Sequence, residues 1–416
     1  MKRIIKAILM VTPLVMIGCG DSLGQPSTET VKGGELLVNF SASAMKTSLI
    51  KAGAADENTT VYGYKAYKIP YTTTDEEGNS VSASGSFIVP IGLPDVVYST
   101  LGLSMVSDDH GTIFSNNEAP SVVADTTGGP AGSAIILTAI GGFATLQPDY
   151  IGFGDSNSHY HPFVLKDSLA NSTVDFIKQV KVFASDNNIT LNSNLFLTGY
   201  SEGGYAAMAT LKKIEEGSTG LTVTVAAPMA GPYALKTMAD AVFSSSTLGV
   251  PAFMADVGYA YAKAKNQSFT ALFNEPYASR VESLFSDDLS DAAIDGNLTK
   301  TTTGSTGLFI QSFVTDYFTN SSNWFKVAVT ENNLHNWAPS TTVKLVQCQG
   351  DEVIPYTIAQ LTAGTMANLG STTVSLVPVE AALGLTTQLK HVACGTPAYK
   401  VTTSIFAQTR KATIGY

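Results

Sequence analysis

A serine lies between two glycines at the point where an apolar run gives way to an alanine-rich one. The stretch "LFLTGYSEGGYAAMA" spans residues 195–209 and contains the pattern G-x-S-x-G as Gly199, Ser201 and Gly203. In a strand–turn–helix this pattern forms a nucleophile elbow, a turn so tight that only small residues fit two positions before and after the serine. The turn lifts the hydroxyl clear of the sheet and directs the N-terminus of the next helix towards it. Because an apolar run precedes the pattern and a helical one follows, we predict that Ser201 is a nucleophile rather than part of an ordinary glycine-rich turn.

A nucleophilic serine needs a general base, and the chain has five histidines. Where the nucleophilic serine lies in such an elbow, the acid comes later in the chain and the histidine comes after the acid. Three of the histidines precede Ser201, and His335 comes before the last predicted strands. His391 alone follows both the serine and a candidate acid. We therefore predict that His391 is the general base, in a loop just before the terminal helix.

The acid is expected at the end of a late strand, before the histidine. The stretch "VKLVQCQGDEVIP" at 343–355 offers Asp351 and Glu352. Asp351, with Ile354 and Pro355 behind it, fits the pattern D-x-x-V-P that is often found at this position. We predict that Asp351 orients the imidazole and stabilises its cation, with Glu352 as the alternative.

The cysteines fit this arrangement. Cys348 comes three residues before Asp351, and Cys394 comes three residues after His391. If the acid and the base meet, their two loops lie side by side, and an oxidising compartment allows the two thiols to pair. We predict a Cys348–Cys394 disulfide; two buried free thiols are the alternative.

An acyl-transfer site also needs two backbone N–H groups for the oxyanion. One comes from the residue after the nucleophile, Glu202, and the other from a loop after an earlier strand. The loop "DHGT" at 109–112 is the candidate, with Gly111 or Thr112 as the donor. The alternative is a polar loop in which His110 is structural.

A second polar stretch, "PDYIGFGDSNSHYHPF" at 148–163, suggests a metal site. His159 and His161, with Asp149 and Asp155, are residue types that bind metals. No further His or Cys has ligand spacing, so we favour a loop that walls the active site and expect no metal and no cofactor.

The N-terminus has the pattern of a targeting segment. Basic "MKRIIK" precedes apolar "AILMVTPLVMIG", which is too short and too interrupted by Pro13 for a good membrane span. Gly18 and Cys19 then resemble a bacterial lipobox. We expect residues 1–18 to be a signal peptide, Cys19 to be the lipidated N-terminus and residues up to 34 to be a flexible tether. A lipidated Cys19 would leave the exported protein anchored to a membrane of the bacterial cell envelope. Plain cleavage near Cys19, without a lipid, is the alternative.

The composition agrees with export. Charged residues make up only 14% of the chain, and the formal net charge is -10. Ser, Thr, Asn and Gly take the place of charged residues on the surface. No Lys/Arg block occurs outside the extreme N-terminus, which argues against nucleic-acid binding because phosphate contacts need a clustered basic face.

Predicted strands and helices alternate along much of the chain. Strands are expected within 62–90, 95–106, 143–150, 191–200, 221–231, 341–355 and 373–380, and helices at 164–187, 203–217 and 396–411. This alternation predicts an α/β fold with a mostly parallel central sheet. The core is expected in two parts, 35–231 and 341–416, separated by a helical insertion at 232–340.

Taken in order, six short motifs resemble those of a known family. "HGT", "PDYIGFGDS", "HPF", "GYSEGG", "MAGPY" and "DEVIP" are similar to those of α/β-hydrolases of the secretory lipase type, which have bacterial lipoprotein relatives. The resemblance implies a Ser201, Asp351 and His391 triad, a helical cap over the sheet and hydrolysis of carboxylic esters, often lipids. The stretch "YSTLGLSMVSDDHGT" at 98–112 departs from the apolar strand expected before the His-Gly pair.

The resulting hypothesis is an exported serine esterase or lipase that acts through an acyl-enzyme on small-molecule or lipid esters. Two alternatives stay open. One is a serine peptidase on the same fold, and the other is a non-catalytic surface lipoprotein that binds a ligand or partner. The sequence does not predict the oligomeric state.

Overall fold

The computed structural model of the chain describes residues 31–51, 54–127 and 135–416. The predicted signal peptide and Cys19 lie outside this part of the chain. Within it, one sheet has the strand order β1-β2-β3-β5-β4-β6-β7-β8-β9. The strands are β1 (Glu35–Phe40), β2 (Gly63–Thr74), β3 (Ser80–Ile91), β4 (Leu103–Asp109), β5 (Ala144–Pro148), β6 (Leu191–Tyr200), β7 (Val225–Met229), β8 (Thr342–Gln347) and β9 (Val374–Pro378).

The sheet has an antiparallel edge and a parallel body. β1, β2 and β3 pair antiparallel, as do β3 and β5. From β5 through β4 to β9 every neighbouring pair is parallel. The carboxyl ends of these parallel strands therefore lie at one edge, which is where α/β proteins place their functional loops.

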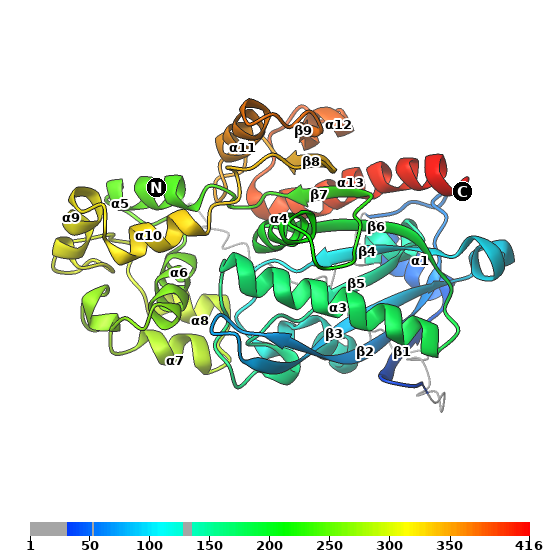
Figure 1. Cartoon of the computed structure of the whole chain (residues 1–416), viewed down its shortest axis with the longest axis horizontal. Helices are drawn as coiled ribbons and strands as arrows, with labels where there is room; N and C mark the ends of the chain where they lie inside the picture. Colours follow the sequence, from blue (N-terminus) through cyan, green and yellow to red (C-terminus); the bar gives the residue numbers. More distant parts are fainter. Residues whose placement is uncertain (1–30, 52–53, 128–134) are drawn as a thin grey trace, which may run out of the picture.

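Helices cover both faces of the sheet (Figure 1). They are α1 (Ala42–Lys51), α2 (Pro120–Thr127), α3 (Lys166–Asp186), α4 (Glu202–Glu215), α5 (Leu235–Ser244), α6 (Pro251–Ala264), α7 (Val281–Ser286), α8 (Asp291–Gly296), α9 (Gln311–Thr319), α10 (Trp324–Glu331), α11 (Tyr356–Asn368), α12 (Val379–Leu383) and α13 (His391–Ile414). α3 and α4 pack together, and α13 packs on β6, β7 and β8. The layers match the predicted α/β class.

α3 shows why such a segment becomes a buried helix. Leu169, Thr173, Phe176, Val180 and Phe183 recur every three or four residues, and all of them are buried. This spacing places them on one face, which the helix presses against the sheet. The ring of Phe176 packs on a tyrosine of β2 with centroids 5.1 Å apart.

The segment between β7 and β8 is helical and forms a separate layer, at the left of Figure 1. It contains α5 to α10 and carries a cluster of aromatic rings around Phe243. Phe309, Tyr317 and Phe325 lie with ring centroids between 4.8 and 5.8 Å from the Phe243 ring. These contacts build a small apolar core inside the insertion, which we call the cap.

Two local predictions around β4 were wrong. Residues Val97–Leu101 form a π-helical turn instead of a strand. β4 then continues to Asp109 through residues that the sequence placed in a polar loop. Its polar side chains have buried partners: Asp108 accepts hydrogen bonds from Gln147 at 2.9 Å and Tyr399 at 2.7 Å. Because buried polar groups are stable once paired, a central strand can carry a polar sequence.

His391 is the first residue of α13, whereas the sequence analysis placed it in a loop before the helix. Gly395 and Pro397 follow closely, and both residue types weaken a helix. Pro397 nevertheless lies inside α13. The long helix, packed on the sheet, overrides the local signal.

Candidate active site

The turn after β6 has the backbone of a nucleophile elbow. Ser201 has φ +60° and ψ -119°, a conformation that non-glycine residues rarely adopt. Its N–H donates to the carbonyl of Met229 at 3.0 Å, which ties the turn to the end of the neighbouring β7. Strain of this kind persists only where the surrounding structure imposes it.

The flanking glycines are required by close packing. A Cβ atom on Gly199 or on Gly203 would collide with the main-chain carbonyl of Asp109. The end of β4, the parallel neighbour of β6, therefore lies directly against the elbow. The pattern G-x-S-x-G is here a steric requirement of two neighbouring strands.

The predicted nucleophile, base and acid meet at this edge of the sheet. Nε2 of His391 lies 3.0 Å from Oγ of Ser201, and Nδ1 lies 2.8 Å from Oδ2 of Asp351. All three side chains are buried. Because the carboxylate only accepts, Nδ1 carries the proton, and Nε2 is free to accept the serine proton.

Asp351 and Glu352 divide two tasks between them. Oδ2 of Asp351 accepts the hydrogen bond from the imidazole of His391. Oδ1 of Asp351 accepts the N–H groups of Val353 and Ile354 at 3.0 and 2.9 Å. Glu352 instead accepts the backbone N–H of His391 at 3.0 Å. The geometry therefore favours Asp351 as the acid and makes Glu352 a clamp on the main chain of the base.

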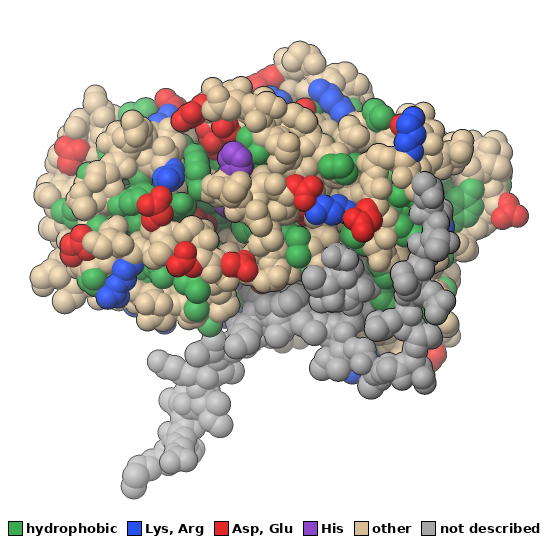
Figure 2. Space-filling model, turned by 90° about the horizontal axis from the view of Figure 1, so that it is seen from below, with side chains coloured by type: hydrophobic (Ala, Val, Ile, Leu, Met, Phe, Trp, Pro, Cys, Tyr) green, Lys and Arg blue, Asp and Glu red, His purple; other side chains and the backbone are tan. Residues whose placement is uncertain are grey.

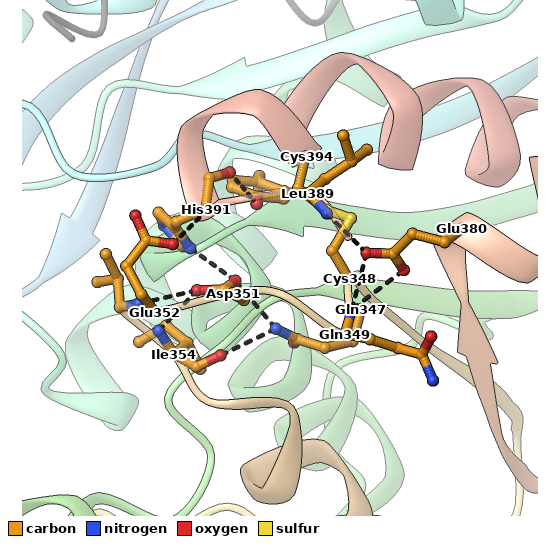
Figure 3. The surroundings of a disulfide bond; sticks show 12 residues. Gln347, Cys348, Gln349, Asp351, Glu352, Ile354, Glu380, Leu389, His391 and Cys394 are labelled. Carbon is orange, nitrogen blue, oxygen red and sulfur yellow. Dashed lines mark hydrogen bonds and ion pairs between the residues drawn. A yellow bond between two sulfur atoms is a disulfide. The ribbon is translucent and has the colours of Figure 1, made fainter. Parts of the chain in front are cut away.

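Further contacts join the acid loop to the base (Figure 3). Cys348 and Cys394 form a disulfide with their Cα atoms 6.1 Å apart. Glu380, buried after β9, accepts the N–H groups of Gln349 and Leu389, each at 3.0 Å. The sequence analysis missed Glu380, because no motif marks a carboxylate that binds only backbone.

Tyr200 is a second missed residue, although it lies within the elbow motif. Its hydroxyl donates to the carbonyl of His391 at 2.6 Å, and its ring centroid lies 5.1 Å from the imidazole. Burial raises the pKa of Tyr200 far above its usual range, so the hydroxyl keeps its proton. The residue before the nucleophile thus helps to hold the base.

The loop after β4 lies beside the nucleophile. His110 stacks on Tyr150 with centroids 4.1 Å apart, and the Tyr150 hydroxyl donates to its carbonyl at 3.2 Å. Burial lowers the pKa of His110, which favours a neutral ring. Gly111 packs against the carbonyl of Tyr200, and Thr112 lines a cavity together with Ser201 and Glu202. The N–H groups of this loop remain our predicted oxyanion donors.

A narrow apolar cavity opens at Ser201. It holds about 90 Å³ and is lined mainly by cap side chains. These include Phe243, Phe253, Met254, Val257, Phe309 and Phe325. The cap therefore lines an apolar cavity beside the predicted nucleophile.

Three of the four residues considered as metal ligands make other contacts. His161 bonds Glu202 at 2.7 Å, Asp155 pairs with Lys68 at 2.6 Å, and Asp149 accepts from Ser121. Among the described residues no group of three or more His, Cys, Asp or Glu side chains is placed to hold a metal ion. His159 and His161 line a second pocket at the edge of the cap, whereas Phe163 of the same stretch lines the cavity at Ser201.

The surface adds two observations. On the face shown in Figure 2, Lys and Arg side chains are scattered among acidic ones. In the part of the chain that the structure describes, no helix is long and apolar enough to cross a membrane.

Comparison with known proteins supports the fold. The model of the prolyl oligopeptidase family matches residues 133–266, which is under half of the chain. No curated protein matches the chain.

Several solved structures are similar over nearly the whole length. A Legionella pneumophila protein named only as a hydrolase has a TM-score of 0.79 at 24% identity, over 92% of this chain and 99% of that one. The rice cell wall degrading esterase LipA from Xanthomonas oryzae gives 0.77 at 23%, over 92% and 97%. Candida antarctica lipase A gives 0.59 at 14%, over 87% and 77%. With the mostly parallel sheet and its covering helices, these likenesses show that the chain has an α/β-hydrolase fold.

Proposed function

We propose that the protein is a serine hydrolase that cleaves carboxylic esters through an acyl-enzyme. One observation carries the proposal: Ser201, His391 and Asp351 form an unbroken hydrogen-bonded chain, and the serine faces an apolar cavity. The hydrolase and esterase names of the structural neighbours agree with it.

The reaction follows from the positions of the protons. His391 Nε2 takes the proton of the Ser201 hydroxyl as Oγ attacks the ester carbonyl, and Asp351 stabilises the resulting imidazolium. The tetrahedral oxyanion is held by the N–H of Glu202 and by the 110–112 loop. The imidazolium then gives its proton to the leaving alcohol, and an acyl-serine forms. Water, activated by the same imidazole, releases the acid and restores the serine.

The cavity supports an apolar and short acyl group. Its lining is mostly aromatic and aliphatic, which suits a hydrocarbon chain. The carboxylate among its lining residues, Glu202, is already paired with His161. Its volume of about 90 Å³ is well below that of most ligand sites, which span roughly 300–1,000 Å³. We therefore expect butyrate esters to react faster than laurate or palmitate esters.

A serine peptidase is the second candidate, because the prolyl oligopeptidase model matches part of the chain. Rates on p-nitrophenyl esters of increasing chain length, compared with amino-acyl p-nitroanilides, separate the two activities. Faster turnover of the anilides would make the protein a peptidase.

The nucleophile itself is tested with a fluorophosphonate probe. The wild type should be labelled and Ser201→Ala should not, while Ser99→Ala, at an exposed serine, serves as the matched control. An unlabelled wild type without ester turnover would favour a non-catalytic binding protein.

Export and anchoring are a separate part of the proposal. The N-terminal pattern that ends at Cys19 supports a lipoprotein attached to a membrane of the cell envelope. The mass of the mature protein tests this part: acyl chains on Cys19 are expected, and their absence would contradict the anchor.

A further inference from the structure

A buried ionisable pair lies directly beside the nucleophile, and the reaction described above does not use it. Glu202 follows Ser201 in the chain, and its side chain is 1% exposed. Oε1 lies 2.7 Å from Nε2 of His161, while Oε2 is buried without a hydrogen-bond partner. A half-satisfied buried carboxylate is costly unless a counter-charge stabilises it.

The hydrogen bonds fix how many protons the pair holds. Nδ1 of His161 lies 2.9 Å from the carbonyl of Ile151, which only accepts, so Nδ1 carries a proton. A second proton must then lie between Nε2 and Oε1 of Glu202. Whether the pair is imidazolium with carboxylate or imidazole with carboxylic acid, its net charge is zero. Loss of that second proton leaves one negative charge.

The groups around the pair do not replace this proton. His110, Tyr150, Tyr205 and Asp256 face it from the loops after β4 and β5, from α4 and from α6. Burial lowers the pKa of His110 and raises that of Asp256, so both favour their neutral forms. Burial also raises the pKa values of the two tyrosines. None of these four groups is a permanent cation.

The charge of the pair matters because of where the oxyanion develops. In the proposed ester hydrolysis the oxyanion binds the backbone N–H of the residue that carries this carboxylate. An uncompensated negative charge in a buried site opposes a second one, and the effect is several times larger than in water. A neutral pair removes that opposition.

We propose that His161 is a positioning and charge-compensating residue: it holds the Glu202 side chain in a pair whose net charge is zero, so that the oxyanion forms beside an uncharged pair. This inference rests on the proposed esterase function. It assigns a role to a histidine whose residue type and spacing suggested a metal ligand.

The pair can exchange protons with solvent through a pocket on the side of α6 that faces away from the cavity at Ser201. His161 and Asp256 line the second pocket, of about 730 Å³, which is separate from the cavity at Ser201. Burial favours the neutral imidazole, but the Glu202 carboxylate outweighs it and raises the pKa of His161. The compensating proton is therefore lost at a higher pH than from an ordinary histidine, as the pH rises through this raised pKa. Turnover should fall on the alkaline side, above the ordinary histidine pKa of about 6.5.

The test compares His161→Gln, Glu202→Gln and the double variant on p-nitrophenyl butyrate. His161→Gln leaves the carboxylate uncompensated, and we expect kcat to fall about 30-fold with KM within about twofold. Glu202→Gln removes the charge and should cost only about threefold. The double variant, neutral again, should recover most of the loss, and neither it nor Glu202→Gln should show the alkaline fall.

His159→Gln, on the same loop, is the matched control, and urea unfolding monitors stability in every variant. The inference is overturned if the double variant is no faster than His161→Gln, or if all variants lose kcat and stability together. If His161→Gln does not fold, Glu202→Gln decides: retention of the alkaline fall would overturn the inference. Wild type without ester turnover counts against the proposed function instead.

Discussion

The two sides of the site are held in different ways. On the nucleophile side, Ser201 is positioned by main-chain packing, because the end of β4 lies directly against Gly199 and Gly203. On the acid–base side, Asp351 and His391 are joined by side chains from distant parts of the chain. A disulfide, Glu352 and Glu380 connect that side.

The two sides should therefore differ in the substitutions that they tolerate. Close packing leaves no freedom, so a single methyl group is expected to displace the serine. The acid–base side has several parallel connections, so losing one should cost stability before it costs geometry. Four predictions test this contrast, from the largest expected effect to the smallest.

The largest effect is expected at the proposed catalytic acid, Asp351. Asp351→Asn removes the charge that fixes the His391 tautomer, and kcat should fall by roughly 10⁴-fold with the fold intact. Steady-state kinetics measures the effect. Glu352→Gln is the matched neighbour and should lose about tenfold, since it holds only a backbone N–H. A larger loss in Glu352→Gln would reverse the assignment of the acid.

The elbow should be nearly as sensitive. Gly203→Ala drives a methyl group into the carbonyl of Asp109, and we expect about a hundredfold loss of kcat. Overpacking should also cost about 1–3 kcal/mol of unfolding free energy. Gly364→Ala, where a new Cβ meets nothing within 4 Å, is the control. Normal kinetics in Gly203→Ala would remove the steric account of the motif.

The disulfide should affect stability more than rate. Removing it in Cys348→Ala/Cys394→Ala opens a loop with a sequence separation of 46. The chain-entropy estimate for such a loop is a loss of about 4 kcal/mol in unfolding free energy. Denaturant unfolding measures the loss, and kcat of the folded variant should stay within a few-fold. If the fully folded variant lost most of its kcat, the disulfide alone would determine the geometry of Asp351 and His391.

Glu380 should give the smallest effect. Glu380→Gln replaces one of the two carboxylate oxygens, both of which accept backbone N–H groups, by an amide nitrogen, at a cost of about 2 kcal/mol of unfolding free energy. Glu282→Gln, at an exposed surface pair, should change little. If the two variants are equally stable, the hydrogen bonds of Glu380 contribute nothing to the stability of the fold.

The sequence predicts the nucleophile side well because its determinants are local. Gly199, Ser201 and Gly203 lie within five residues, and the apolar run and the helix on either side complete the signal. The base and acid follow from chain order and spacing. The parallel α/β class follows from the alternation of strands and helices.

The sequence does not predict contacts that only packing creates. Glu380 and the His161–Glu202 pair join segments between 9 and 41 residues apart, and no short pattern marks them. β4 carries polar residues because Gln147 and Tyr399 reach Asp108 inside the fold. His391 begins a helix despite Gly395 and Pro397, since the helix packs on the sheet.

The bond between Cys348 and Cys394 also determines how the protein should be produced. Bacterial cytosol keeps thiols reduced, whereas the periplasm oxidises them. Expression without a leader in an ordinary laboratory strain would yield chains whose acid and base segments are not covalently joined. Preparations from the two compartments would then differ in shelf life and heat tolerance while sharing one sequence.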